Sequence, residues 1–173
     1  DLVSSVQHDA IDEWRNRSRD RLAELRKSLK DRHDRSGELA YLLEPDLKEA
    51  RGGLRDITAL RAVALSGAVS VSLEHISSAE SILMNVREAL HIVTGRDKDR
   101  LLFQEQDKVA ELLNYADADA LMGAVAQAAR SVDYLLESTW YRLDHRDKKG
   151  INKFLKKPRV TQVSPGIIIA HQE

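Results

Sequence analysis

The sequence predicts an all-α protein, an antiparallel helical bundle with one irregular Gly-Gly loop and an extended C-terminal tail. Two observations lead to this prediction. The chain has eight Gly and three Pro in 173 residues, too few for the many turns of a β-sandwich or barrel. Apolar residues also recur at steps of three and four along most of the chain, as they do on one face of an α-helix.

The first predicted element is one long exposed helix from about Val3 to Asp34. Its apolar stripe is narrow, and the intervening positions are mostly charged, including the run from Arg15 to Arg21. The helix should end near Ser36-Gly37, where glycine can supply the C-terminal cap. The stripe comprises Val3, Gln7, Ile11, Trp14, Leu22, Leu25 and Leu29.

A loop is predicted next, because Pro45 favours an extended Glu44 and stops any helix there. This loop should continue through Gly53 and lead into a helix over 54–66. The pattern at 68–76 is ambiguous, since apolar residues alternate with polar ones as in a strand, although a helix fits almost equally well.

Three more helices complete the predicted bundle. The first covers about 77–94, with Ser77 or Ser78 as its cap, and the second covers about 104–113. The last begins after Asp117 or Asp119, either of which can cap it, and its periodicity fades beyond Asp144.

The division into parts follows from this pattern: residues 1–145 form the helical domain, and residues 146–173 form a basic linker and extended tail. Between Arg146 and Arg159 seven Lys or Arg residues accompany one acid. A solvated connector is the favoured interpretation, and phosphate contact is the alternative. The β-rich run 167–169 is predicted to find no strand partner within this chain.

Composition excludes several classes of protein. The net charge of −1 gives no overall attraction to nucleic acid. A membrane protein is not expected, because no apolar run approaches the roughly 20 residues that span a bilayer. The chain has no cysteine, so it forms no disulfides or thiolate metal sites, which fits a cytoplasmic location.

The loop that precedes the helix over 54–66 holds the residues best suited to binding or catalysis. The pair Gly52-Gly53 followed by a helix start could bring backbone amides close to an anion. Nearby cations, Lys48, Arg51 and Arg55, could bind phosphate oxygens, and Asp56 could ligate Mg²⁺. The spacing matches neither a Walker A loop nor a dinucleotide-binding motif, so a charged loop with a capped helix is an open alternative.

Two stretches, taken in order, carry a family resemblance. The first is Glu44-Pro45-Asp46-Leu47-Lys48-Glu49-x-x-Gly52-Gly53-Leu54-Arg55-Asp56, and the second is Val86-Arg87-x-x-Leu90-His91 followed by Asp99-Arg100-Leu101-Leu102-Phe103-x-x-Gln106-x-x-Val109-Ala110. Together they resemble the helical region that follows the nucleotidyltransferase core in bacterial PII uridylyltransferase/uridylyl-removing enzymes. The preceding Arg32-His33-Asp34-Arg35-Ser36-Gly37 also resembles the family's approach to the first stretch, so the likeness covers about residues 32–114.

This resemblance implies a part in Mg²⁺-dependent nucleotidyl transfer from an NTP, UTP or ATP, to the PII signal protein of nitrogen regulation. The Gly-Ser element and paired aspartates of such a core are absent here, so this fragment alone should be inactive. Asp56 is the candidate catalytic and metal-binding residue. Lys48, Arg51, Gly52, Gly53 and Arg55 are the candidates for nucleotide or phosphate contact. The tail would lead to a missing downstream domain.

Several alternatives stay open at this stage. Asp56 could instead form a structural pair with Arg55 that fixes the loop. The whole chain could be a helical docking module for PII or another regulator, and a homodimer could form through the first helix. A metal-dependent phosphohydrolase using His33-Asp34 is a further, weaker hypothesis.

Overall fold

The structure, a computed structural model, describes residues 2–152, 160–164 and 167–170. The chain divides into two units, residues 1–140 and 141–173, and each is described by itself.

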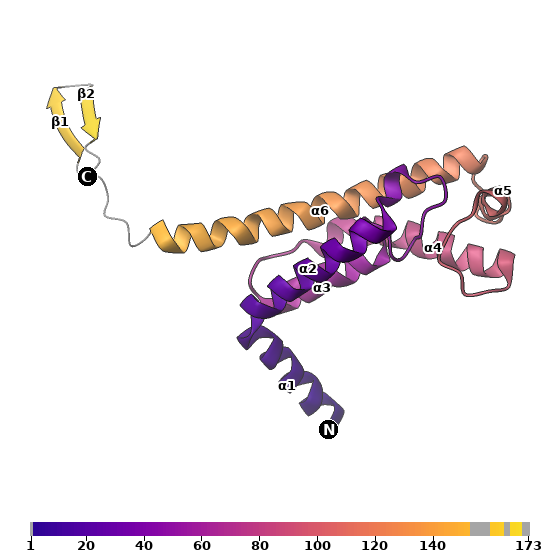
Figure 1. The fold of residues 1–173 in the computed structure, drawn as a ribbon, viewed down its shortest axis with the longest axis horizontal. Helices are drawn as coiled ribbons and strands as arrows, with labels where there is room; N and C mark the ends of the chain where they lie inside the picture. Colours follow the sequence, from indigo (N-terminus) through magenta and orange to yellow (C-terminus); the bar gives the residue numbers. More distant parts are fainter. Residues whose placement is uncertain (1, 153–159, 165–166, 171–173) are drawn as a thin grey trace. The chain divides into compact units, whose positions relative to one another are not determined.

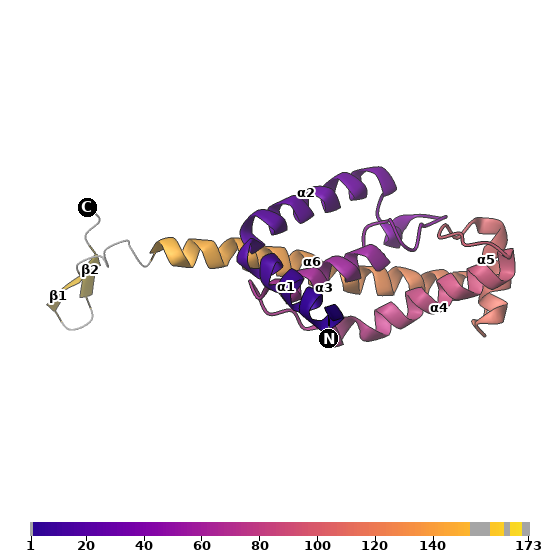
Figure 2. The ribbon, with the colours of Figure 1, turned by 90° about the horizontal axis from the view of Figure 1, so that it is seen from below.

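The first unit is built from long helices that run alternately in opposite directions (Figures 1 and 2). They are α2 (Ser18–Ser36), α3 (Leu54–Ser66), α4 (Ser77–Thr94) and the first part of α6 (Ala118–Asn152). The short α5 (Phe103–Leu112) connects α4 to α6. The predicted all-α class is therefore confirmed.

The predicted single first helix is two helices, α1 (Leu2–Asn16) and α2, with a bend at Arg17. The apolar stripe is interrupted by the charged run between Trp14 and Leu22, so each half can pack on its own. The Trp14 indole N–H donates to the Ala62 carbonyl at 2.9 Å and thereby ties α1 to α3.

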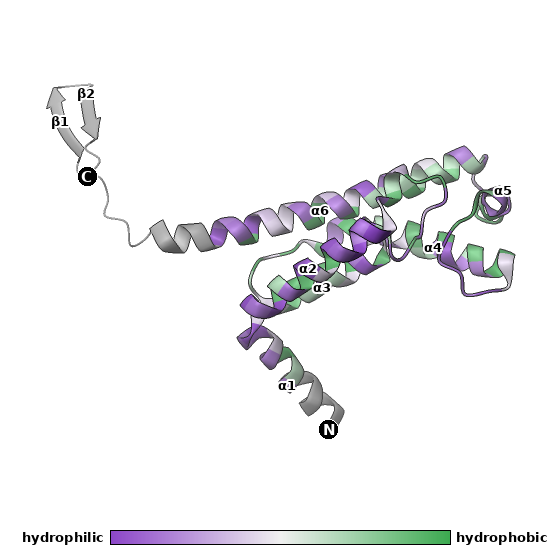
Figure 3. Ribbon diagram, viewed as in Figure 1, coloured by the Kyte–Doolittle hydropathy of each residue, from purple (hydrophilic) through white to green (hydrophobic). Residues whose placement is uncertain are grey.

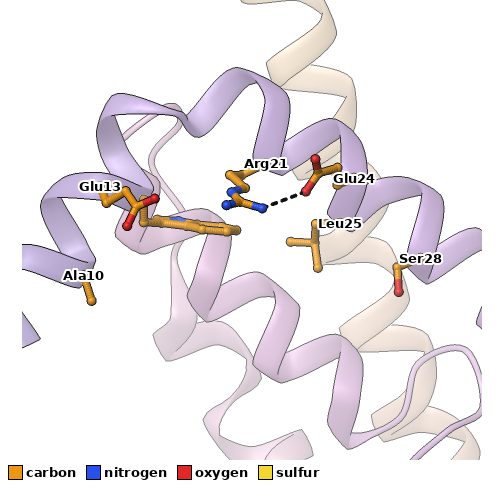
Figure 4. A pocket seen from close by; sticks show the side chains of 7 residues that line it. Ala10, Glu13, Arg21, Glu24, Leu25 and Ser28 are labelled. Atoms are coloured by element: carbon orange, nitrogen blue, oxygen red, sulfur yellow. Dashed lines mark hydrogen bonds and ion pairs between the residues drawn. The ribbon is translucent and has the colours of Figure 1, made fainter.

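The bend opens a hollow of about 450 Å³ between α1 and α2 (Figure 4). Arg21 and Glu24 line it and are joined by a 3.1 Å ion pair, while Leu25 forms part of its apolar wall. The homodimer through this region stays a prediction. A second copy of the chain would contact α1, α2 and this hollow, and not the apolar face of a single straight helix.

Two other local predictions need correction. Residues 68–76 form neither a strand nor an α-helix, but an irregular segment followed by the 3₁₀ helix Leu73–Ile76. Ser77 does not cap α4, because Ile76 occupies the cap position and the Ser77 hydroxyl donates to the Glu74 carbonyl.

The predicted cap of the last helix is correct. The Asp117 carboxylate accepts a hydrogen bond from the Ala120 amide at 2.7 Å, at the start of α6. The helix then continues to Asn152, beyond the predicted fading of its pattern at Asp144.

The core lies where α3, α4 and α6 face one another, and the more hydrophilic residues cluster on α2 (Figure 3). Each large aliphatic side chain removed from water there contributes about 1.5–3 kcal/mol. Nine such side chains have no measurable or almost no exposed surface: Ile57, Leu60, Val63, Leu83, Val86, Leu90, Leu121, Val125 and Leu136.

In the second unit, β1 (Val160–Ser164) pairs with β2 (Ile167–Ala170) in an antiparallel hairpin. The prediction that the β-rich run has no partner in this chain is therefore wrong. The turn signal Ser164-Pro165-Gly166 separates two short β-rich runs that can pair with each other. Of the basic stretch, residues 153–159 and the side chains from residue 147 on lie outside the described part of the chain.

None of the helices in the described part of the chain combines the length and apolar content that a bilayer crossing requires.

Candidate functional site

The loop between α2 and α3 is folded by backbone hydrogen bonds near its two ends. The Arg51 amide donates to the Gly37 carbonyl at 2.9 Å, and the Leu39 amide donates to the Arg51 carbonyl at 3.0 Å. In between, one Asp46 carboxylate oxygen accepts from the Lys48 and Glu49 amides at 3.0 and 2.7 Å. The loop is thus closed at its base and turned sharply at Asp46.

Asp56 lies in the first turn of α3, fully buried beneath this loop. Its Oδ1 accepts from Arg32 Nη2 at 2.5 Å, and its Oδ2 accepts from the Gly52 amide at 2.7 Å. His33 Nε2 lies 2.9 and 3.1 Å from the two oxygens, which requires a proton on that nitrogen for a hydrogen bond. Three donors therefore converge on one carboxylate, and they come from α2 and the loop.

The protonation equilibrium of Asp56 reflects opposing effects. Burial by itself raises the pKa of the carboxyl group. The hydrogen bonds and positive charges of His33 and Arg32 outweigh burial and hold the pKa below its ordinary value. The carboxylate is therefore charged in the folded protein at neutral pH.

Arg32 and His33 are central to this cluster, although Arg32 was not among the site residues predicted from the sequence. The Arg32 side chain is 7% exposed, and its second Nη donates to the Glu49 carbonyl at 2.6 Å. It therefore connects α2 to both the loop and α3. These residues stand more than 20 positions before Asp56, so no local spacing rule could have paired them.

Gly52 and Gly53 allow a close approach within the protein itself. Gly52 has φ +84°, and a Cβ there would lie 2.6 Å from the Ala129 carbonyl oxygen of α6. A Cβ on Gly53 would lie 2.8 Å from the carbonyl oxygens of Leu47 and Ala50. Gly52 thus lets the loop pack directly on α6, and Gly53 lets the loop fold closely on itself.

The amides that could have bound an anion are also engaged inside the chain. Gly52 donates to Asp56, and Gly53 donates to the Ala50 carbonyl at 2.9 Å. The amides of Leu54 and Arg55 donate to carbonyls of the loop, at 3.0 and 3.2 Å. In this conformation the start of α3 offers no free cradle of amides to a phosphate.

Arg51, a predicted phosphate contact, instead connects the loop to α6. It donates to the Asp133 carboxylate from Nε at 2.6 Å and from Nη2 at 3.2 Å, and Nη2 also lies 3.2 Å from Glu137. The Asp133 hydrogen bond is the largest cause of a raised pKa for Arg51, against the lowering effect of burial. Arg51 is therefore neutralised by acids of the same chain.

The two remaining candidate cations also have partners. Lys48 Nζ lies 3.3 Å from Asp99, a carboxylate that also accepts from Arg87 Nε at 2.5 Å. Burial raises the pKa of Asp99, but the Arg87 and Lys48 contacts together lower it below the ordinary value. Arg55 lies 3.2 Å from Glu49, and over half of its side chain is exposed.

Taken together, the predicted site residues are close in space, yet their charges and hydrogen bonds are satisfied mostly within the chain. Among residues whose side chains are described, no three His, Asp or Glu gather as a metal site would require. His33 bonds Asp56, so the phosphohydrolase hypothesis finds no set of ligands there. The geometry can tie helices together and position a loop.

Comparison with known proteins agrees with the resemblance noted in the sequence. The family model for GlnD PII-uridylyltransferase matches residues 20–67 and 69–140. A bifunctional uridylyltransferase/uridylyl-removing enzyme of Streptomyces coelicolor is 51% identical over 139 residues, 80% of this chain and 17% of that enzyme. Its namesake in Mycobacterium tuberculosis is 32% identical over 165 residues, 90% of this chain and 20% of that enzyme.

A third relative with the same name, from Azotobacter vinelandii, is 38% identical over 105 residues, covering 53% of this chain and 12% of that enzyme. The chain thus spans about a fifth or less of the length of these relatives. No solved structure matches it. Because the family model covers most of the helical unit, the chain belongs to the GlnD PII-uridylyltransferase family.

Proposed function

We propose that this chain is the helical part of a longer enzyme that transfers a uridylyl group from UTP to a PII protein. The names of the relatives support uridylyl transfer over adenylyl transfer, since each is called a uridylyltransferase. The reacting carboxylates would belong to a nucleotidyltransferase core outside this chain. By itself the chain should not transfer nucleotides.

Within that enzyme, the chain supports the active site by fixing the shape of the loop over 37–53. The observation that carries this proposal is the buried Asp56 carboxylate, which binds Arg32 and His33 of α2 and the Gly52 amide of the loop. Asp56 would then be a positioning residue that acts through the loop.

Direct ligation of Mg²⁺ by Asp56 in the complete enzyme stays a prediction. The groups around Asp56 in this chain do not by themselves fit a Mg²⁺ site. Mg²⁺ requires several oxygen ligands, whereas both Asp56 oxygens are taken by three donors, one of them the cationic Arg32. A Mg²⁺ ion would have to displace these donors or be held by the core.

The test is uridylylation of a PII protein by the full-length enzyme, with UTP and a titration of Mg²⁺, comparing Asp56→Asn and Arg32→Met. If Asp56 positions the loop, both variants lower the transfer rate while the Mg²⁺ concentration for half-maximal rate stays unchanged. Asp20→Asn is the matched control, because Asp20 is exposed on α2 and lies apart from the Asp56 cluster.

Two results would count against this proposal. A selective increase in the Mg²⁺ requirement of Asp56→Asn, without the same change in Arg32→Met, would make Asp56 a metal ligand. Transfer that survives intact in both folded variants would remove the cluster from the support of the active site.

A docking module is the second candidate function, and a groove between α2 and α6 favours it. The groove has a volume of about 640 Å³, and Leu136 and Trp140 belong to its apolar lining. Its α2 side carries the cations Arg26, Lys27 and Lys30, of which Lys30 pairs with the lining residue Asp34 at 2.6 Å. The Arg26 guanidinium lies 5.3 Å from the centre of the Trp140 ring. Such a groove could receive an acidic, partly apolar segment of PII or another regulator.

The docking function is tested with Lys27→Glu in the full-length enzyme. If PII binds in the groove, charge reversal raises the KM for PII while leaving the maximal rate nearly unchanged. An unaltered KM removes the groove as the PII site.

A further inference from the structure

Two segments that are about 55 residues apart in sequence form a short antiparallel ribbon in the first unit. The Leu47 amide donates to the Asp99 carbonyl at 2.8 Å, and the Leu101 amide donates to the Pro45 carbonyl at 2.9 Å. Between these bonds, Asp46 and Arg100 form an antiparallel bridge. The loop after α2 is thereby joined to the segment that enters α5.

Side chains fix the outer end of this ribbon. The Glu44 carboxylate accepts from the Phe103 amide at 3.1 Å, and the amide group of Gln106 donates to the Leu43 carbonyl at 2.7 Å. Arg100 Nε donates to the Glu44 carbonyl at 3.2 Å. The Leu43 and Phe103 backbones are therefore held near each other by hydrogen bonds.

This fixed backbone presents large apolar side chains to water. Leu43 is 83% exposed and Phe103 is 72% exposed, whereas Leu47 and Leu101 in the same ribbon are fully buried. Single exposed apolar residues are common on proteins. Two on one hydrogen-bonded ribbon are different, because the fold has already ordered the backbone that carries them, which leaves only their side chains to be ordered on binding.

Several polar groups near these two side chains have partners within the chain, although Arg100 and Gln104 are exposed. The Glu44 carboxylate binds the start of α5, Gln106 is 4% exposed and bound to the loop, and Asp99 is paired with Arg87 and Lys48. Leu43 and Phe103 themselves offer apolar contact, so the partner that covers them should present an apolar face to them.

We propose that Leu43 and Phe103, called here the ribbon surface, dock against another region of the same full-length polypeptide. The inference rests on the proposed membership in a longer enzyme, since this chain spans 17% and 20% of two relatives. A domain of the same polypeptide is present at high effective concentration and covers the surface permanently. Such cover also removes an exposed apolar patch that would favour aggregation.

The test is thiol labelling with a maleimide, compared between this 173-residue chain and the full-length enzyme. The chain contains no cysteine, so Leu43→Cys and Phe103→Cys each introduce one thiol, and peptide mass spectrometry follows the same positions in the full-length enzyme. Both side chains are exposed, and their loss should leave the helical circular dichroism of the chain unchanged. Tyr134→Cys on α6 is the matched control, because Tyr134 is 77% exposed and lies outside the ribbon.

The expected result is that labelling at positions 43 and 103 slows about tenfold or more in the full-length enzyme, as for an interface that is open less than a tenth of the time. Labelling at position 134 should not slow in this way. Equal rates in the chain and the enzyme at 43 and 103 would overturn the proposal. So would equal slowing at position 134.

The other possible occupants give distinct outcomes. Protection that appears only when PII is added assigns the surface to PII, and protection that rises with enzyme concentration assigns it to a second copy. Either result overturns docking within one polypeptide. Labelling requires no catalysis, so its result is independent of activity. An enzyme that is protected at position 43 but fails to uridylylate PII would contradict the proposed function and still support this inference.

Discussion

Replacing Asp56 with asparagine removes one negative charge with almost no change in shape. In the native protein two carboxylate oxygens accept from Arg32, His33 and the Gly52 amide. Asparagine has one oxygen, and its NH₂ group must face at least one of these donors. We expect Asp56→Asn to destabilise the fold strongly, because the Arg32 side chain would stay buried without its counter-charge.

The magnitude follows from the hydrogen bonds and the ion pair that asparagine cannot form. A hydrogen bond to a charged group contributes about 1.5–3 kcal/mol, and a buried donor left without an acceptor costs about 1–3 kcal/mol. Breaking a buried ion pair from one side costs about 3–5 kcal/mol in other proteins. We therefore expect the free energy of unfolding to fall by about 3 kcal/mol or more.

The assay is urea unfolding of the 173-residue chain, followed by circular dichroism. Asp34→Asn is the matched control, and the loss of its exposed pair with Lys30 should leave the urea midpoint nearly unchanged. Arg32→Met should also be costly, and the double variant Arg32→Met/Asp56→Asn should lose less than the sum of the two single losses. A loss below about 1 kcal/mol for Asp56→Asn, or simple additivity, would refute this account of the cluster.

Three further predictions concern the same loop. Gly52→Ala should lower the free energy of unfolding by about 2 kcal/mol more than Gly67→Ala, measured in urea. Both glycines have positive φ, but only a Cβ on Gly52 meets a backbone carbonyl, so equal losses would contradict the close packing. Asp56 has a folded pKa below its unfolded value, so its contribution is present above that unfolded value and is lost as the pH falls through the folded one. The difference in unfolding free energy between wild type and Asp56→Asn should therefore shrink between about pH 5 and about pH 2, and a constant difference would contradict this. Arg51→Met should cost about 1–2 kcal/mol and the exposed Arg55→Met less than about 0.5 kcal/mol by the same assay, whereas equal costs would place no weight on the Asp133 contact.

Much of the fold could be predicted from the spacing of apolar residues and from the glycines that end helices. The helix over 54–66 was predicted with the limits that the structure has, because its apolar stripe is continuous and Gly67 ends it in a left-handed conformation. The bend at Arg17 was missed, since the charged run around it is helical in its local preferences. The interruption of the apolar stripe allows a bend there, and packing such as the Trp14 contact with Ala62 goes with it.

The candidate site residues lie together as a cluster, but their contacts differ from those expected. Lys48, Arg51 and Arg55 were predicted to be available to phosphate, because no sequence pattern predicts their ion pairs. Their partners in the structure are Asp99, Asp133 and Glu49, respectively. The alternative hypothesis paired Asp56 structurally with Arg55, whereas its partners in the structure are Arg32 and His33.

The sequence by itself determined the helical class, the positions of most helices, the glycine pair at the loop and the family resemblance. These depend on the local spacing of apolar residues and on short motifs, both of which can be recognised in the sequence. The tertiary structure alone decided that Asp56 is buried, that Gly52 packs on α6 and that Leu43 and Phe103 share one ribbon. The physical reason is that a carboxylate's role is set by which donors and how much water surround it, and its side-chain donors here lie more than 20 residues away along the chain.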